Sequence, residues 1–306
     1  MPVSLIGIDV GGTNFRLGVV QNLRVVWEKR FQADFAGLCR THSAALALSA
    51  ITQVLNQAIA EARLIYPQVA GVGLGFPGFI EPHFGRVLSS PNLPGLINAD
   101  LLTPLAAQNG LPVTLENDAS AAAFGEYSLS QPDTGSLIYI GLGTGVGGGL
   151  VLQGKLHGGD HGVAMEIGHL TVERSGRLCG CGNRGCLEQY ASTNGVVQTY
   201  TELTGDTLSA FDIAQRALQK NAAAAHAYAQ AGEYLASGLA HIAKVVDVRD
   251  VVIGGGMSAS WSLMQAAFEQ RLQEELIPTL RGKLHIRLSQ AQDQAGIIGA
   301  AMLALR

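Results

Sequence analysis

The chain has 306 residues, of which 47% are hydrophobic and only 14% are charged, and its formal net charge is −4. This length is sufficient for two domains of ordinary size with sizeable hydrophobic cores. The slight excess of acidic residues and the lack of a basic run argue against nucleic acid or an anionic membrane surface as a partner.

The first half of the chain alternates short apolar segments with helical periodicity. The expected elements are two strands joined by a glycine turn over 4–20, a helix over 44–64, a buried strand over 69–80 that ends in a Pro-Gly turn, and a strand followed by a helix over 112–127. The last of these helices is expected to begin at Asp118 or Ser120, where a side-chain oxygen can cap free backbone N–H groups.

The second half repeats this order of elements. The expected elements are strands flanking a glycine turn over 136–154, helices over about 209–246 and 261–277, a buried strand with a glycine turn over 250–258, and an apolar helix over 293–306. The segment 136–154 reaches membrane length, but its six glycines between 141 and 149 and its alternating ends indicate two strands and a turn. The N-terminus lacks a signal-peptide pattern, so we expect a cytoplasmic protein.

The two glycine-turn hairpins each open a half-chain of mixed strands and helices. This weak internal duplication predicts an α/β protein of two similar lobes with a cleft between them. We expect an N-terminal α/β lobe over 1–117 and a C-terminal α/β lobe over 118–293. The final helix, about 294–306, is expected to pack back on the N-terminal lobe.

Glycine makes up 39 of the 306 residues, against a usual share of about 7%, and the glycines cluster in turns. In the first turn, Asp9 stands at the end of a buried strand, and the backbone N–H groups that follow it can face a phosphate. The Asp9 carboxylate would then be within reach of the magnesium ion that accompanies the phosphate. An ordinary hairpin with a solvated Asp is the alternative.

The second turn contains Gly143-x-Gly145-x-x-Gly148. A strand follows it, whereas a Rossmann site requires a helix, and no Gly-Lys-Ser/Thr of a Walker loop is present. Thr144 nevertheless offers a hydroxyl donor to a phosphate. A third turn, over 253–258, leaves room for a flat ligand, and the three turns together predict a nucleotide site.

Glu116, Asn117 and Asp118 stand where an apolar strand becomes a helix. Catalytic groups tend to lie at such strand ends in α/β proteins. Helix capping by Asp118 is the simpler alternative, and the two roles do not exclude each other.

Three of the four cysteines lie beside a histidine in one short segment. The spacing His169-x9-Cys179-x-Cys181-x4-Cys186 supplies three thiolates and one imidazole, a complete tetrahedral set for structural zinc with no position left for a catalytic water. A redox pair or a disulfide would not explain the histidine, and disulfides rarely persist in a reducing compartment. We therefore expect a zinc loop over 169–186.

Glu166 and Glu188 bracket this loop. Carboxylates accept strong charge-assisted hydrogen bonds from hydroxyl-rich ligands, and a nearby metal would hold both of them still. Plain surface exposure is the alternative for these two residues.

Together these motifs resemble those of the ROK family, which groups bacterial sugar kinases with sugar-responsive repressors. The resemblance covers the whole chain and is strongest in the cysteine motif followed by Leu-Glu. The motifs that carry it are DVGGTNFR (9–16), PNLPG (91–95), ENDAS (116–120), GTGVGGG (143–149), GVAMEIGH (162–169), CGCGNRGCLE (179–188) and VIGGG (252–256).

The resemblance implies a two-lobed, actin-like and hexokinase-like (ribonuclease H-like) α/β fold with a duplicated core, an interlobe cleft and a zinc-binding loop. It implies ATP and Mg²⁺ as cofactors beside structural Zn²⁺. The residues that it assigns to the nucleotide are Asp9, Gly11, Gly12, Thr13, Thr144 and Gly145 at the phosphates and Gly254, Gly255 and Gly256 near the adenosine. Those that it assigns to the sugar are Asn92, Asn117, Asp118, Glu166, His169 and Glu188. His169 would bind zinc through one ring nitrogen and a sugar hydroxyl through the other.

The function that the resemblance implies is glucokinase-like transfer of the γ-phosphate of ATP to the 6-hydroxyl of a hexose, with Asp118 as the catalytic base. An aldohexose such as glucose is the expected substrate, while allose, N-acetylglucosamine, N-acetylmannosamine and fructose stay open, as does polyphosphate as donor. A non-catalytic sugar sensor is the alternative from another class, but a sensor need not keep Asp118 or the phosphate hairpins. The family's repressors carry a DNA-binding motif before the first hairpin, and only eight residues precede Asp9 here, so no such role is expected. Relatives tend to be homodimers or homotetramers.

Overall fold

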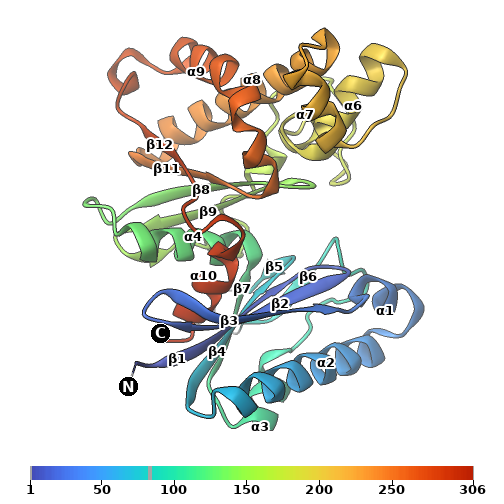
Figure 1. Cartoon of the computed structure of the whole chain (residues 1–306), viewed down its shortest axis with the longest axis vertical. Helices are drawn as coiled ribbons and strands as arrows, with labels where there is room; N and C mark the ends of the chain where they lie inside the picture. Colours follow the sequence, from blue (N-terminus) through green and yellow to red (C-terminus); the bar gives the residue numbers. More distant parts are fainter. Residues whose placement is uncertain (1, 82–84, 306) are drawn as a thin grey trace. The chain divides into compact units, whose positions relative to one another are not determined.

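The computed structural model describes residues 2–81 and 85–305. Strands and helices alternate along the chain, as Figure 1 shows. Two compact units are distinguished by their packing: unit 1 comprises Met1–Gly135, Gly149–Ala164 and Gln290–Arg306, and unit 2 comprises Ser136–Gly148 and Met165–Ser289. The two domains expected from the sequence stay a prediction, because units defined by packing do not test separate folding.

Unit 1 contains a five-stranded sheet in the order β3-β2-β1-β4-β7. Its strands are β1 (Ser4–Val10), β2 (Asn14–Gln21), β3 (Arg24–Gln32), β4 (Val69–Phe76) and β7 (Val113–Asn117). β2 pairs antiparallel with β1 and β3, whereas β4 pairs parallel with β1 and β7. The strands expected over 4–20 are confirmed, and β3 extends the sheet beyond them.

Helices lie on both faces of this sheet. The remaining elements of unit 1 are the helices α1 (Phe35–Thr41), α2 (Ala44–Ile65), α3 (Leu102–Asn109), α4 (Asp118–Ser130) and α10 (Ala295–Leu303) and the short strands β5 (Phe79–Ile80), β6 (Val87–Ser89) and β10 (Lys155–Leu156). Ile6 of β1 is buried in one cluster with Ile51 of α2, whereas its neighbour Leu5 packs with Ile297 of α10. Because successive side chains of a strand point to opposite faces, α2 and α10 cover opposite faces.

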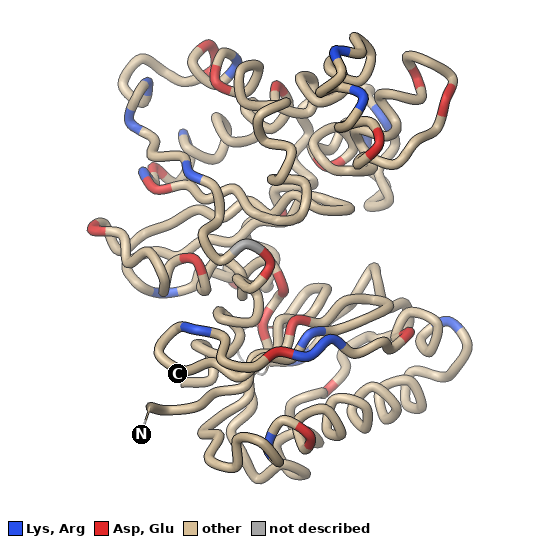
Figure 2. Tube along the Cα trace, in the orientation of Figure 1, with Lys and Arg blue, Asp and Glu red and all other residues tan. Residues whose placement is uncertain are grey.

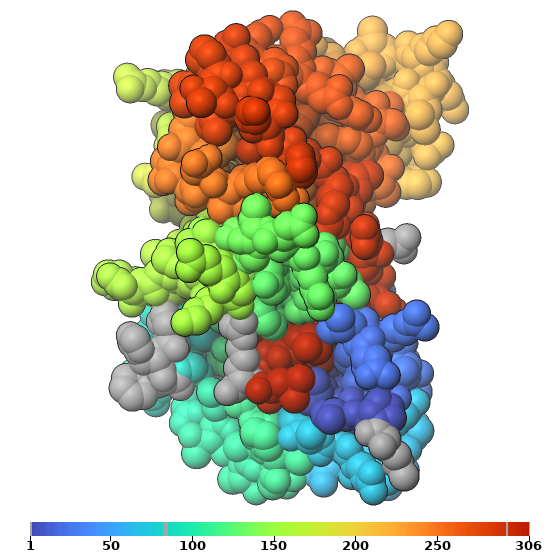
Figure 3. Space-filling view, turned by 90° about the vertical axis from the view of Figure 1, so that its left-hand side faces the viewer, coloured from blue at the N-terminus to red at the C-terminus, as the bar shows by residue number. Residues whose placement is uncertain are grey.

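Glycines allow α10 to approach the sheet closely. A Cβ at Gly73 would lie 1.7 Å from the carbonyl oxygen of Ala300, and one at Gly7 would lie 1.9 Å from that of Ile297. Any other residue would therefore displace the helix. Figure 3 shows the C-terminal residues in red, enclosed by blue and green residues from the first half of the chain.

The first turn of α4 differs from the expectation in its cap. Asn117 keeps extended backbone angles at the end of β7, and its Oδ1 accepts a hydrogen bond from the amide of Ser120 at 3.0 Å. Asp118 is already helical, so capping by Asp118 or Ser120 is wrong. The strand end supplies the extended conformation that an N-cap residue needs.

The second sheet has the order β10-β9-β8-β11-β12. Its further strands are β8 (Leu137–Leu142), β9 (Val146–Leu152), β11 (Asp250–Gly254) and β12 (His285–Leu288), and the α-helices of unit 2 are α5 (Glu188–Ala191), α6 (Thr193–Thr204), α7 (Ala210–Leu218), α8 (Ala222–Val246) and α9 (Trp261–Glu275). The single helical region expected over 209–246 is two helices, because the chain breaks at Lys220, with φ of 66°, and Asn221 caps α8.

The two sheets share one topology. In each, the first strand of a hairpin (β1 of β1–β2, or β8 of β8–β9) pairs parallel with a later strand, β4 or β11. That strand in turn pairs parallel with the edge strand, β7 or β12. An antiparallel strand, β3 or β10, extends each hairpin. The duplicated α/β core predicted from the sequence is therefore confirmed.

Within the described residues, no helix combines the length and apolar character that a membrane crossing requires. Figure 2 shows acidic and basic positions interspersed along the described part of the trace.

Candidate functional site

The first glycine turn, between β1 and β2, is held by backbone hydrogen bonds from the segment that leads into α1. The amide of Ala36 donates to the carbonyl of Gly12 at 2.9 Å, and that of Ala33 donates to the carbonyl of Thr13 at 3.2 Å. Gly11 and Gly12 are partly exposed and Thr13 is exposed. The turn therefore has a fixed backbone and a hydroxyl that a phosphate ligand can reach.

Asp9, near the end of β1, is held by Arg16 across the hairpin. The strand register pairs the two residues, and Arg16 Nη2 donates to Asp9 Oδ2 at 2.8 Å. Arg16 Nη1 also lies 2.8 Å from the carboxylate of Asp293 and 3.7 Å from that of Glu28. Three carboxylates surround one guanidinium, so the excess charge is negative and favours a cation. Mg²⁺ binds oxygen ligands of this kind, so the donor set fits it.

The residues 116–118 form a continuous hydrogen-bonded run at the end of β7. Asn117 Nδ2 donates to the carbonyl of Gly78 at 3.1 Å, and Asp118 Oδ1 accepts from the amide of Ala119 at 2.9 Å. Glu116 Oε1 accepts from the amide of Asn117 at 2.9 Å, and burial raises the pKa of the Glu116 carboxyl. Because Asn117 supplies the cap, Asp118 is not needed for capping.

Contacts within unit 1 bring Asn92 near these groups. The hydroxyl of Ser90 donates to the carbonyl of Pro77 at 2.6 Å, next to the residue that binds Asn117. A Cβ at Gly12 would lie 3.9 Å from the carbonyl oxygen of Asn92, whose side chain is exposed. The first glycine turn, Asn92 and Asn117 thus belong to one region of unit 1.

Unit 2 gathers the four predicted metal ligands. One ligand atom from each of His169, Cys179, Cys181 and Cys186 lies within 4.8 Å of all the others. Isolated antiparallel bridges, including the one between Thr171 and Cys186, fold the loop back on itself. The cluster predicted from the spacing is therefore confirmed.

The distances in this cluster fit Zn²⁺. The Sγ atoms of Cys181 and Cys186 are 3.7 Å apart, as are Cys179 Sγ and His169 Nδ1. Tetrahedral zinc with Zn–S bonds of about 2.3 Å places two sulfurs about 3.8 Å apart. All four cysteines of the chain are free. Burial raises the pKa of Cys179 to about 12, so this thiol depends on the metal charge to become a thiolate ligand.

The carboxylates of Glu166 and Glu188 lie near different ring nitrogens of His169. His169 Nε2 lies 3.8 Å from Glu166 Oε2, and Nδ1 lies 3.8 Å from Glu188 Oε1. The side chains of Glu166 and Glu188 are 39% and 23% exposed. Burial, and then the neighbouring charge of Glu188, raise the pKa of Glu166, against the opposing effect of His169. A ligand with several hydroxyls would find two carboxylates and one imidazole nitrogen here.

The second glycine turn lies beside Glu188. A Cβ at Gly145 would meet Glu188 Oε2 at 2.8 Å, so only glycine leaves this carboxylate in place. The amide and the hydroxyl of Thr193 both donate to the carbonyl of Gly143, at 2.9 and 3.0 Å. Thr144, at the tip between these glycines, is exposed.

The third turn lies against the end of β8. A Cβ at Gly254 would lie 2.6 Å from Tyr139 Oη, and one at Gly255, where φ is 80°, would lie 2.3 Å from the carbonyl oxygen of Leu142. A Cβ at Gly256 would meet open space. Unit 2 therefore places its two glycine turns at the ends of adjacent parallel strands, β8 and β11.

Two arginines that hold these regions in place were not predicted from the sequence. The contact of Arg16 with Asp9 could have been predicted from the hairpin register, which places the two residues opposite each other. Arg177 fixes the zinc loop to α6, but nothing in its local sequence indicated so distant a partner as Glu202.

Comparisons with known proteins agree with these features. The glucokinase of Streptomyces coelicolor is 31% identical to this chain, over 98% of this chain and 96% of its own length. The N-acetylmannosamine kinase of Salmonella heidelberg is 33% identical over 99% of this chain and 98% of its own. The solved structure of a ROK family glucokinase from Streptomyces griseus, in complex with glucose and AMPPNP, superposes with a TM-score of 0.83 at 30% identity and covers 99% of each chain.

The family model extends over nearly the whole chain. It is described as the ROK family, and it matches residues 5–306. The match therefore includes both five-stranded sheets except for the first residue of β1, and it includes the His/Cys cluster. The chain belongs to the ROK family.

Proposed function

We propose that the protein transfers the γ-phosphate of ATP to the 6-hydroxyl of a hexose, and that glucose is its substrate. The observation that carries this proposal is the environment of His169, whose Nδ1 lies beside Cys179 and whose Nε2 lies beside Glu166. This arrangement supports metal binding on one side of the ring and hydroxyl binding on the other. The S. griseus glucokinase that binds glucose and AMPPNP supports both substrates.

The proposed hexose ligands are the two carboxylates beside His169, the imidazole itself, and further amide and carboxylate groups. Carboxylates and amides accept and donate several hydrogen bonds to neighbouring hydroxyls. The residues proposed to contact the sugar are Asn92, Asn117, Asp118, Glu166, His169 and Glu188.

The proposed nucleotide ligands are the glycine turns. Backbone N–H groups and hydroxyls at such turns bind phosphate oxygens without a steric barrier. Those proposed to meet the phosphates are Asp9, Gly11, Gly12, Thr13, Thr144 and Gly145, and those proposed near the adenosine are Gly254, Gly255 and Gly256. Asp9 would hold Mg²⁺, which when bound neutralises charge on the phosphates.

Asp118 is the proposed catalytic base. It would orient the 6-hydroxyl toward the γ-phosphorus and accept its proton as the O–P bond forms and the bond to the β-phosphate oxygen breaks. In a loose transition state the proton leaves late, so positioning contributes much of the effect. Because Asn117 caps the helix, the proposed role of Asp118 does not compete with capping.

Replacing Asp118 by Asn tests this assignment. We expect Asp118→Asn to lower kcat by about 10²–10⁴, because the amide cannot accept the proton. Binding of the hexose, measured by calorimetry, should change by only a few-fold. A kcat within a few-fold of that of the wild type contradicts the assignment.

N-Acetylmannosamine is the second candidate substrate, because a kinase for that sugar is 33% identical to this chain. Allose, N-acetylglucosamine and fructose belong to the same test, as does polyphosphate in place of ATP. A coupled assay of ADP release over these sugars, with ATP or polyphosphate as donor, separates the candidates. Binding without turnover of any sugar would support a sugar sensor. A cytoplasmic location and a homodimer or homotetramer complete the proposal.

A further inference from the structure

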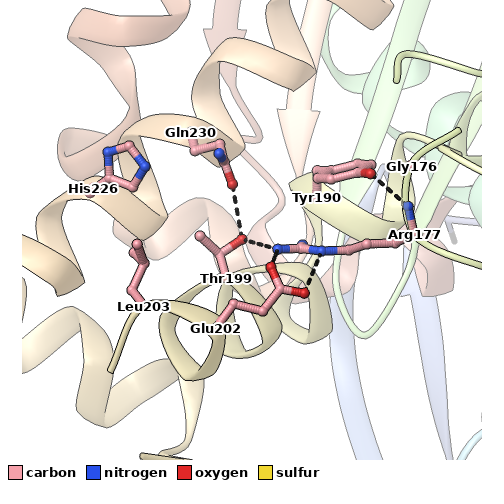
Figure 4. A pocket seen from close by; sticks show the side chains of 8 residues that line it. All are labelled: Gly176, Arg177, Tyr190, Thr199, Glu202, Leu203, His226 and Gln230. Atoms are coloured by element: carbon pink, nitrogen blue, oxygen red, sulfur yellow. Dashed lines mark hydrogen bonds and ion pairs between the residues drawn. The ribbon is translucent and has the colours of Figure 1, made fainter. Parts of the chain in front are cut away.

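Arg177 lies in the loop between His169 and Cys179, and its side chain is only 10% exposed. Figure 4 shows it along one wall of a cavity of about 320 Å³ lined also by residues of α6 and α8. It is neither one of the clustered metal ligands nor one of the proposed sugar ligands. Its burial therefore needs a separate explanation.

The guanidinium joins the loop to two helices. Nη1 donates to the carbonyl of Gln189 in α5 at 2.7 Å. Nη2 donates to Thr199 Oγ1 at 2.9 Å, and Nε and Nη2 donate to the two carboxylate oxygens of Glu202 at 3.2 and 2.5 Å. Bidentate Arg–carboxylate pairs fix orientation as well as distance. The loop is thereby bound to α5 and α6 at one point.

An aromatic stack fixes the plane of the guanidinium. Its central carbon lies 4.7 Å from the ring centroid of Tyr190, whose ring lies 4.2 Å from that of Tyr234. The Tyr190 hydroxyl also accepts a hydrogen bond from the backbone amide of Arg177 at 2.9 Å. A Cβ at Gly176 would lie 2.1 Å from that hydroxyl, so the preceding residue must be glycine for this contact.

These contacts converge on the segment that carries Glu188. Gln189, whose carbonyl Arg177 holds, directly follows Glu188, and Tyr190 follows Gln189. The carbonyl of Arg177 accepts from the amide of Gly185, next to the metal ligand Cys186. The metal-ligand cluster and the guanidinium thus lie at the two ends of one short stretch of chain.

We propose that Arg177 is a positioning residue that sets the direction of the Glu188 carboxylate by holding the backbone that directly follows it. It acts through the backbone of α5, and its effect is separate from metal binding. The functional consequence is that a fixed Glu188 carboxylate strengthens binding of the hexose, and this consequence rests on the proposed function. Lysine cannot replace it, because one ammonium group cannot reach the Gln189 carbonyl, Thr199 and Glu202 together.

The test compares Arg177→Lys with Arg184→Gln. Arg184 is exposed in the same loop and makes one long side-chain hydrogen bond, 3.3 Å to the carbonyl of Gly176, so its variant is the matched control. We expect Arg177→Lys to raise the KM for the hexose about tenfold, since the Glu188 carboxylate loses a charge-assisted restraint on the backbone that follows it. The KM for ATP and the zinc content should stay at the wild-type level, and the control should match the wild type throughout.

Hydrogen exchange of the zinc-loaded protein gives a readout that does not depend on the sugar. We expect faster amide exchange at residues 187–191 in Arg177→Lys than in the wild type and in Arg184→Gln. Unchanged exchange there, loss of zinc, or an equal rise in both KM values overturns the proposal. A wild type that neither binds nor phosphorylates any hexose refutes the proposed function instead, while the exchange result still decides the role of Arg177.

Discussion

At the scale of single residues, Glu116 illustrates how a strand end perturbs a carboxyl group. Burial raises its pKa above the ordinary value of 4.5, and the hydrogen bond from the Asn117 amide opposes this shift only in part. A raised carboxyl pKa in the folded state means that the folded protein binds the proton more tightly. Stability is therefore lost as pH rises from the unfolded pKa through the folded pKa.

Glu116→Gln should remove this pH-dependent loss. Above the folded pKa the variant should melt roughly 2 °C higher than the wild type, because no charge is buried, and below pH 4.5 the two should converge. Melting temperatures from pH 4 to 8 measure the effect. Glu269→Gln, at an exposed position of α9, is the control and should follow the wild type. A variant that melts lower than the wild type at pH 8 contradicts this account.

At the scale of elements, the contact of α10 with the sheet depends on missing side chains. The helix lies against β1 and β4 at Gly7 and Gly73, and against α4 at Gly299, where a Cβ would lie 1.7 Å from the carbonyl oxygen of Ala121. Backbone atoms cannot give way locally, so an added methyl group must move a whole helix.

Gly73→Ala should therefore destabilise the protein by at least the ~1–3 kcal/mol typical of overpacking. Gly158→Ala is the control, since a Cβ there meets nothing within 4 Å and its φ is not positive. Urea unfolding of both variants measures the difference. Equal stability of the two would show that the helix can shift without cost.

The zinc loop gives a second prediction at this scale. Cys181→Ser removes one of four ligands, and we expect loss of zinc and a rise of about tenfold in the KM for the hexose, because His169 and Glu188 lose their support. Metal analysis and steady-state kinetics measure both effects. Cys39→Ser, outside the cluster, is the control for general loss of a thiol. Normal kinetics in the zinc-free variant would disprove the link between metal and sugar.

At the scale of the whole molecule, ligand binding should raise the free energy of unfolding. A ligand at 100 times its dissociation constant adds about 2.7 kcal/mol to the free energy of unfolding. We expect the largest rise in melting temperature with glucose among the candidate hexoses, and a further rise with AMPPNP and Mg²⁺. A larger rise with N-acetylmannosamine would reassign the substrate, and no rise with any hexose would refute the proposed function.

The parts that the sequence predicted are those with short-range signals. The hairpins, α2, α9 and the His/Cys cluster follow from glycine turns, from a helical repeat and from ligand spacing within 18 residues. The parts that it missed depend on partners distant in the chain. β12 and α6 carry weak local patterns and are stabilised by packing, and Arg177 meets Glu202 only because α6 folds against the loop.

By itself, the sequence determined the candidate groups: glycine turns proposed to bind phosphates, a thiolate–imidazole set that could hold zinc, and carboxylates beside that set. These depend on residue types at short spacings, which local covalent geometry already limits. Only the tertiary structure decided which atom faces which partner, as when Asn117 takes the cap that Asp118 was expected to supply and Arg16 holds Asp9. Such choices are decided by backbone angles and by burial, and both arise only once distant segments have packed together.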